Sequence, residues 1–352
     1  MVLSSTALKN KTDVAEVFRK KMLDWYDLNR RVLPWRALSG GTPDPYHVWL
    51  SEVMLQQTTV RAVIPYFLKF IKRWPDVHAL AAADNDDVMA AWAGLGYYAR
   101  ARNLHKCAKV VSGEFGGVFP DEIDALRALP GIGDYTSAAI LSIAFDKSSV
   151  VIDGNVDRVM ARYHAVETPF PAGKKDVKEL ADFYAGGFTD RPADYAQSLM
   201  DLGAGVCTPK SPGCSSCPLN DGCKAFGRGE DYPKKAPKKV KPHKYGYVYW
   251  ITNDCGDVLV QRRSGTGMLG GMLGLPTSDW LEDQSQLKHL DFQNIRVLPD
   301  SVRHVFTHFS LELQLFYGNV DSIDCSSYFF CTPDDFFGDE FPTLFKKSIR
   351  LF

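Results

Sequence analysis

Hydrophobic positions recur with helical spacing along residues 11–202. Apolar side chains three and four residues apart, with charged residues between them, predict an amphipathic helix over residues 11–31. The same spacing predicts helices over residues 45–58, 60–74, 86–93, 121–128, 134–144, 156–166, 174–184 and 191–202. A β-branched run at residues 149–152 is the one expected strand in this region. The N-terminal part of the chain is therefore predicted to be helical.

The hydrophobic spacing changes after residues 233–244, PKKAPKKVKPHK, whose lysines and prolines predict an exposed basic linker. Beyond it, strands are expected over residues 245–252, 258–262, 302–307 and 309–320, the first two joined by a hairpin turn at 253–256. A glycine-rich loop at 264–276, a short helix over 280–289 and a partly helical tail at 334–352 complete a small α+β domain. The predicted domains are thus 1–232 and 245–352.

Length and composition fit this division. A chain of 352 residues exceeds one ordinary hydrophobic core, and 45% apolar with 24% charged residues is a globular composition. The net charge of −1 means that any nucleic-acid surface must be local. No apolar run approaches the length of a membrane span, and the N-terminus has no apolar signal region, so we expect neither secretion nor membrane insertion.

A turn with two glycines, LPGIG at residues 129–133, comes directly before an expected helix. Gly131 and Gly133 permit close backbone approach, and their N–H groups with the next helix N-terminus can cradle a phosphate. About twenty residues later Asp153 ends a β-branched apolar run, which predicts a stiffly held, partly desolvated carboxylate. A plain helix–helix turn followed by an N-cap aspartate explains the same residues.

Glu52 lies within the helix expected from residue 45, whose start is marked by Asp44 and Pro45. Its neighbours at i−4 and i+3, Val48 and Leu55, share its helical face and are apolar. Burial against them raises the pKa of a carboxyl group, as a general acid requires. A glutamate on the helix surface is the alternative.

Two stretches, residues 30–36 (RRVLPWR) and 94–102 (GLGYYARAR), place aromatic side chains beside arginines. Aromatic groups can wedge between bases while the cations hold phosphate. Helix ends with core aromatic residues are the alternative interpretation of both stretches.

Four cysteines follow the helical region with the spacing C-x6-C-x2-C-x5-C: Cys207, Cys214, Cys217 and Cys223. Thiolates this close in sequence can converge on one inorganic centre. Zinc is the rival to an iron–sulfur cluster, although zinc ribbons favour two separated cysteine pairs. The other C-terminal cysteines show no ligand spacing.

Together these motifs resemble the adenine DNA glycosylases of the helix-hairpin-helix superfamily, which includes endonuclease III. The resemblance is carried by residues 33–36, 45–58, 94–104, 129–133, 151–159, 207–223 and 305–313. It implies an all-helical, two-lobed catalytic region with double-stranded DNA in its cleft. It also implies a [4Fe–4S] cluster on Cys207, Cys214, Cys217 and Cys223, and a C-terminal Nudix-like domain that reads the opposite base.

The resemblance also implies roles for single residues. Glu52 matches the general acid that protonates a flipped adenine, and Asp153 matches the carboxylate that stabilises or captures the sugar cation. Tyr135 and Asn155 match residues that assist these acids. The remaining matches are Trp35, Arg36, Leu55 and Asp201 in the adenine pocket, Gln57 and Tyr97 (or Tyr98) entering the duplex, Gly131 and Gly133 on phosphate, and Phe306, Thr307 and His308 at 8-oxoguanine.

Three departures from the family pattern stand out. Thr307 replaces the usual serine, which keeps the hydroxyl group and adds a methyl group. Residues 39–42 look like a small insertion. No Arg-Glu-x-x-Glu-Glu cluster follows the loop at 265–276, so metal-dependent diphosphate hydrolysis is not expected.

The implied function is a monofunctional glycosylase that removes adenine opposite 8-oxoguanine or guanine, as a monomer in the bacterial cytoplasm at the nucleoid. An endonuclease III-like lyase needs an amine nucleophile, but Tyr135 holds the matching position and no lysine lies between residues 129 and 146. A lesion-binding protein without catalysis is disfavoured by the two acids. A Nudix pyrophosphatase is disfavoured by the missing acidic cluster.

Overall fold

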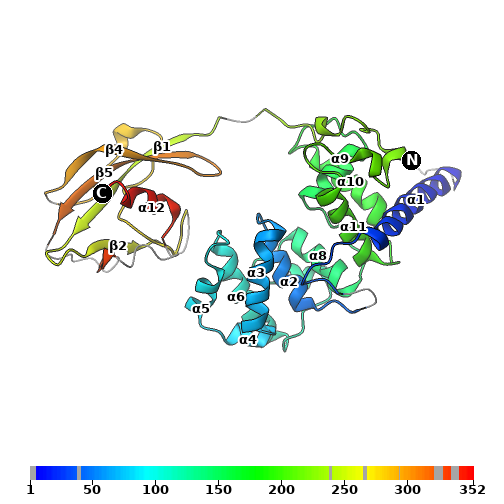
Figure 1. The fold of residues 1–352 in the computed structure, drawn as a ribbon, viewed down its shortest axis with the longest axis horizontal. Coiled ribbons are helices and arrows are strands. Elements are labelled where there is room, and N and C mark those ends of the chain that lie inside the picture. Colours follow the sequence, from blue (N-terminus) through cyan, green and yellow to red (C-terminus); the bar gives the residue numbers. More distant parts are fainter. Residues whose placement is uncertain are drawn as a thin grey trace. The chain divides into compact units, whose positions relative to one another are not determined.

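The computed structural model describes residues 5–37, 41–237, 240–264, 268–292, 294–320, 328–333 and 341–352, with side chains from residue 13 on. The chain divides into two compact units, Met1–Pro237 and Lys238–Phe352 (Figure 1). The first unit is helical and the second is built on one sheet. A search of the described residues finds no helix with both the length and the apolar character that a membrane span requires.

The helices of the first unit form two groups that meet at α8. One group holds α2 (Pro45–Leu55), α3 (Val60–Arg73), α4 (Val77–Ala82), α5 (Asn85–Trp92), α6 (Ala99–Glu114) and α7 (Ile123–Ala128). The other holds α1 (Ser5–Asn29), α9 (Gly154–Tyr163), α10 (Lys174–Ala185) and α11 (Pro192–Gly205), so the first helix packs against the last ones (Figure 1). The central helix α8 (Asp134–Phe145) contacts α2, α7 and α11 and is buried on most sides, which explains its small apolar residues.

The helix boundaries follow their predicted caps. The Asp44 carboxylate accepts a hydrogen bond of 2.8 Å from the Tyr46 N–H group, and Pro45 takes the first position of α2, as expected. The predicted helix over 45–58 ends earlier, at Leu55, because the chain turns there. The helix α4 was not predicted, although Asp76 caps its start.

The strand predicted at residues 149–152 is wrong. These residues connect α8 to α9 without forming a strand, because the surrounding elements are helices and offer no strand edge for pairing. The Ser149 hydroxyl donates instead to the Ala138 carbonyl at 2.6 Å. The segment is therefore anchored to α8 by a side chain, and it leads directly to Asp153.

The second unit is a mixed sheet with strand order β3-β2-β1-β5-β4, and β6 pairs with β2. The strands are β1 (His243–Thr252), β2 (Val258–Arg262), β3 (Leu273–Gly274), β4 (Arg296–Val305), β5 (Ser310–Asn319) and β6 (Tyr328–Cys331). The two central strands β1 and β5 run parallel and the other pairs antiparallel. The predicted hairpin is present, since Thr252 lies opposite Val258.

Both faces of the sheet carry apolar side chains. Alternate residues of β5, Leu311, Leu313 and Leu315, are fully buried and share a core with Phe345 of α12 (Thr343–Ile349). On the other side Tyr249 packs with partly buried residues that include Phe292. The part of the predicted tail over residues 334–340 lies outside the described residues.

The helix predicted over residues 280–289 is wrong. The structure has only a short 3-10 turn there, Gln284–Gln286. Backbone pairing with the sheet prevails over helical spacing: Leu281 pairs with Tyr245 of β1, and Thr277 pairs with Val248. Part of the expected linker is also held in place, because Lys235 forms a bridge with Phe170 of the helical unit. The first unit accordingly extends to Pro237.

Candidate active site

One cleft of about 1260 Å³ in the helical unit collects most of the residues expected to act on the base. It is bounded by α2, the turn before α8, the start of α9 and part of α11. Its lining includes Trp35, Arg36, Glu52, Leu55, Gln57, Gly131, Gly133, Tyr135, Asp153 and Asn155. Segments more than a hundred residues apart in sequence therefore converge on one space.

Glu52 projects from α2 and is only 6% exposed. The Tyr135 hydroxyl donates a hydrogen bond of 2.7 Å to its Oε2 atom. The pKa of Glu52 is raised to about 7. Burial is the main cause and the charge of Asp153 adds to it, whereas the Tyr135 hydrogen bond and the charge of Arg36 act in the opposite direction. A carboxyl group with this pKa is partly protonated at neutral pH and can donate a proton.

Asp153 is the N-cap of α9 and also lines the cleft. Its role as a helix cap and a position in the site are therefore compatible. Its Oδ1 atom accepts hydrogen bonds from the backbone N–H groups of Asn155 at 2.8 Å and Val156 at 2.7 Å. Its Oδ2 atom accepts one from Asn155 Nδ2 at 2.7 Å. These three donors fix the orientation of the carboxyl group in the cleft wall.

Two residues that the sequence did not single out hold Asn155 in place. Arg158 Nη2 donates to Asn155 Oδ1 at 2.9 Å and also to the Gly203 carbonyl at 2.7 Å. A Cβ atom at Gly203 would lie 2.5 Å from Asn155 Cβ, so only glycine allows this approach between α9 and α11. The available signal in the sequence was the spacing of Arg158, which lies about one helical turn after Asn155.

Asp201 does not line the cleft, in contrast to the expectation for the adenine pocket. It is 2% exposed, and its carboxylate accepts hydrogen bonds from Arg36 Nη1 at 2.7 Å and Arg31 Nε at 2.6 Å. Burial opposes its ionisation, but the hydrogen bonds and charges of the two arginines outweigh it and hold the pKa of Asp201 below its usual range. Asp201 thus lies behind the pocket and fixes Arg36, whose side chain does face the cleft.

Gln57 and Tyr97 are both exposed, and both have left-handed backbones with φ of 56° and 51°. Gln57 lines the cleft, whereas Tyr97 lies outside its lining and is 55% exposed. Tyr98, the alternative to Tyr97, packs against the helical core and is the N-cap residue of α6. The structure therefore presents Tyr97 to solvent.

The predicted phosphate cradle is the turn before α8. Gly131 has a φ of 77°, and a Cβ atom there would lie 2.7 Å from Asn103 Cβ. Gly133 is exposed and directly precedes α8, where free backbone N–H groups collect. Both glycines face the cleft.

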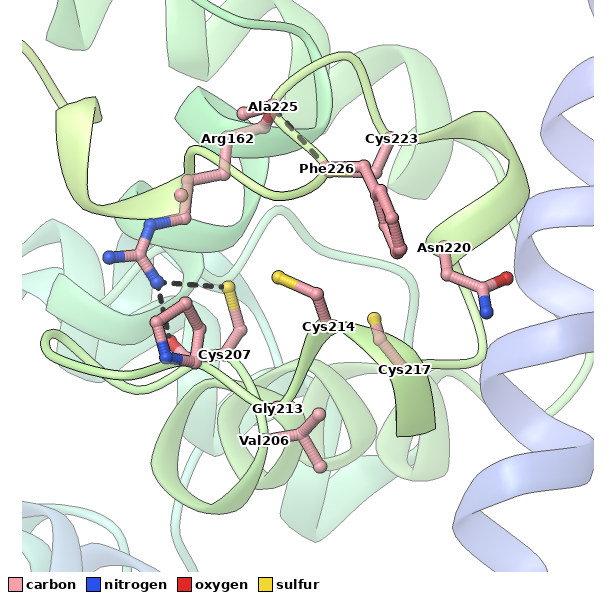
Figure 2. A pocket seen from close by; sticks show the side chains of 12 residues that line it. Arg162, Val206, Cys207, Gly213, Cys214, Cys217, Asn220, Cys223, Ala225 and Phe226 are labelled. Carbon is pink, nitrogen blue, oxygen red and sulfur yellow. Dashed lines mark hydrogen bonds between the residues drawn. The ribbon is translucent and has the colours of Figure 1, made fainter.

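The four closely spaced cysteines surround a cavity of about 30 Å³. Figure 2 shows the sulfur atoms of Cys207, Cys214 and Cys217 directed into the same space, and Cys223 also lines it. None of these four residues forms a disulfide, and Arg162 Nη1 lies 3.4 Å from Cys207 Sγ. Among the described residues, no three His, Cys, Asp or Glu side chains are gathered to hold one metal ion. The thiol set fits a larger centre that takes one cysteine per iron.

In the second unit, the expected 8-oxoguanine residues form a tight turn between β4 and β5. The Phe306 N–H group donates to the Phe309 carbonyl at 2.9 Å. Thr307 and His308 are exposed at its tip, whereas Phe306 is half-buried and stacks on Trp280 with ring centroids 5.7 Å apart. Phe306 therefore supports the turn while the other two face solvent.

Two family models match the chain in the two places that the fold indicates. Residues 50–184 match the HhH-GPD superfamily base excision DNA repair protein, and residues 247–351 match the NUDIX domain. With the two carboxyl groups in one cleft, this fold defines the class of protein: a helix-hairpin-helix DNA glycosylase of base-excision repair, carrying a Nudix-like domain.

Relatives that cover most of the chain identify the family within this class of DNA glycosylases. An adenine DNA glycosylase of Buchnera aphidicola is 33% identical over 306 residues, covering 85% of this chain and 84% of the relative. The human adenine DNA glycosylase is 34% identical over 373 residues, covering 86% of this chain and 67% of the relative. The chain belongs to the adenine DNA glycosylase family, and its reaction is the removal of adenine from DNA.

Solved structures agree with this fold. A thermostable thymine-DNA glycosylase superposes with a TM-score of 0.54 at 28% identity, covering 63% of this chain and 99% of that one. Endonuclease III in a non-covalent DNA complex superposes with a TM-score of 0.50 at 20% identity, covering 65% of this chain and 98% of that one. The helical unit therefore shares the endonuclease III fold.

Proposed function

We propose that this enzyme removes adenine mispaired with 8-oxoguanine or guanine in duplex DNA and does not cut the strand. The observation that carries the chemistry is the pair of acids in one cleft. Glu52 is buried and its pKa is shifted toward protonation, while Asp153 accepts hydrogen bonds from two backbone N–H groups and from the Asn155 amide. Two carboxyl groups in such different environments can serve as acid and as anion.

The reaction begins when adenine leaves the helical stack and enters the cleft. Glu52 donates its proton to a ring nitrogen of adenine, and the electron pair of the C1′–N bond moves onto the departing base. The Asp153 carboxylate stabilises the cation left on the sugar or captures it covalently. Water then adds its hydroxyl group to C1′, and its proton returns to Glu52, which restores the enzyme.

Recognition of the opposite base is assigned to the exposed turn of the second unit. The Thr307 hydroxyl is a donor and an acceptor at the tip of a backbone-closed turn. 8-Oxoguanine differs from guanine by a carbonyl group and an N–H group, which a hydroxyl can address. Threonine has the same hydroxyl group as the serine that is usual in the family, and its additional methyl group does not remove it.

The cysteines at 207, 214, 217 and 223 would hold a [4Fe–4S] cluster, which when bound cross-links the loop between them. Arg162 supports the loop beside them by donating to the Thr208 carbonyl at 2.7 Å. Arg158 donates to the Cys207 carbonyl at 2.8 Å and to Asn155, so the same side chain touches the cysteine loop and the acid's partner. We further propose that the enzyme works as a monomer in the bacterial cytoplasm, at the nucleoid.

A labelled duplex with one adenine opposite 8-oxoguanine tests the proposed function. After incubation, strand cleavage that needs added alkali is the expected result, because base removal alone leaves an alkali-sensitive abasic site. Cleavage without alkali, absent from a Glu52→Gln control, would show a lyase step and overturn the monofunctional assignment. No cleavage under either condition would overturn the proposed substrate.

A further inference from the structure

Arg100 lies in the first turn of α6, and its guanidinium is surrounded by backbone carbonyl groups from the end of α2 with the loop after it, and from the loop before α6. It donates hydrogen bonds of 2.6–3.2 Å to five carbonyl groups, of Val53, Met54 and Gln56 on one side and of Leu95 and Gly96 on the other. A cation is unfavourable at the start of its own helix. Its conformation is explained by the loops that it joins.

The two loops carry Gln57 and Tyr97. Gln56 is the C-cap of α2 and Gln57 follows it, while Tyr97 comes just before α6. Both Gln57 and Tyr97 have a left-handed φ, which is unfavourable for residues with a Cβ atom and persists only where neighbouring structure holds it. Their side chains are nevertheless exposed, so their own packing does not supply that restraint.

Arg100 contacts both loops closely enough to restrain the backbones of Gln57 and Tyr97. Its backbone N–H group donates to the Tyr97 carbonyl at 2.8 Å, and its guanidinium carbon lies 5.6 Å from the centroid of the Tyr97 ring. On the other side it satisfies the last carbonyl groups of α2, which have no partner within that helix. The side chain of Arg100 is not part of the cleft lining.

We propose that Arg100 is a positioning residue that fixes Gln57 and Tyr97 relative to each other, so that the two side chains enter the duplex as one unit when adenine leaves the stack. The proposal rests on the proposed function and on the resemblance, which implies that Gln57 and Tyr97 enter the duplex. Arg100 touches neither the base nor the acids. Its contribution is the shared restraint on two exposed side chains.

A double-mutant cycle tests the shared restraint. Single-turnover excision is measured for Tyr97→Ala, Arg100→Ala and the double variant. Each single change is expected to slow excision about tenfold or more. The rate of the double variant is expected to lie within about threefold of the rate of the slower single variant. If the two losses multiply instead, Arg100 acts independently of Tyr97 and the proposal is overturned.

A second readout separates positioning from general damage. Replacing the target adenine by 2-aminopurine reports unstacking as a gain in fluorescence, which Arg100→Ala should lower several-fold at saturating protein. The pH midpoint of excision should stay near that of the unchanged enzyme, because Glu52 keeps its surroundings. A shifted midpoint with full unstacking would show that Arg100 acts through Glu52 and would overturn the proposal.

Two further variants complete the experiment. Lys106→Ala removes an exposed charge from the same helix and should leave both readouts unchanged. Arg100→Lys keeps the charge but lacks the planar fork that reaches five carbonyl groups, so it replaces Arg100→Ala in the cycle if the alanine variant does not fold. Wild-type protein that releases no adenine would contradict the proposed function; an active wild type with an additive cycle contradicts only the role of Arg100.

Discussion

The Tyr135 hydroxyl and the Glu52 carboxylate meet at 2.7 Å, although 83 residues separate them. Tyr135 lies in the first turn of the central helix α8, and Glu52 lies on α2, which packs against α8. The hydrogen bond lowers the pKa of the acid, but burial dominates and leaves it near 7. This contact joins the helix that follows the Gly131–Gly133 turn to the buried carboxyl group of α2.

Glu52→Gln should reduce adenine excision by about 100-fold or more, because the amide has nearly the same shape but no proton to donate. DNA affinity should remain close to that of the unchanged enzyme. Single-turnover excision and binding to a labelled duplex measure the two effects separately. Excision at a near wild-type rate would show that another group is the acid.

The same residue predicts how stability depends on pH. The pKa of Glu52 rises from 4.5 to about 7 on folding, so its favourable contribution is complete below about pH 4.5 and is lost as the pH rises through 7. Glu52→Gln carries no such dependence and should exceed the wild type in free energy of unfolding at pH 8 by about 3 kcal/mol. Urea unfolding of both proteins at pH 4.5 and pH 8 measures the difference in free energy of unfolding between the variant and the wild type. The same difference at the two pH values would contradict the shifted pKa.

Asp153→Asn should slow excision by about 100-fold or more while changing stability little, because asparagine caps a helix about as well as aspartate. The variant therefore separates the negative charge of Asp153 from its capping hydrogen bonds. Asp84→Asn, the same change at the N-cap of α5, provides the matched control and should leave excision unchanged. Equal rates for wild type and Asp153→Asn would remove Asp153 from the chemistry.

Asp201→Asn should destabilise the helical unit by about 3 kcal/mol, because it leaves the buried Arg36 without its carboxylate partner. Excision should fall as well, since Arg36 loses the contact that directs it along the cleft wall. Asp24→Asn, which breaks an exposed pair with Lys20, should change stability by less than about 1 kcal/mol. Thermal unfolding of both variants measures the two losses of stability. Equal decreases in Tm would show that burial of the Asp201–Arg36 pair is unimportant for stability.

Thr307→Ala should narrow the preference for adenine opposite 8-oxoguanine over adenine opposite guanine by about tenfold, through loss of one hydroxyl contact. Thr307→Ser keeps the hydroxyl and should retain the preference. The ratio of excision rates on the two duplexes is the relevant measurement. An unchanged ratio in the alanine variant would assign recognition of the opposite base to other residues.

Local patterns in the sequence carried much of the fold. Helical spacing and caps such as Asp44 identified most of the helices, because these signals lie within a few residues of each other. The predictions at residues 149–152 and 280–289 were wrong for one shared reason. In both segments the conformation depends on distant partners: the first finds no strand to pair with, and the second pairs with β1.

The sequence by itself determined the family resemblance, the two acids, the cysteine spacing and the order of the domains, because motifs of this kind are local in the chain. Only the tertiary structure decided how residues are shared between sites. It placed Asp201 behind Arg36, made Asp153 a helix cap as well as a cleft wall, and brought Arg100 to two loops at once. These relationships join distant segments, and they depend on burial and hydrogen bonds that form only when the helices pack.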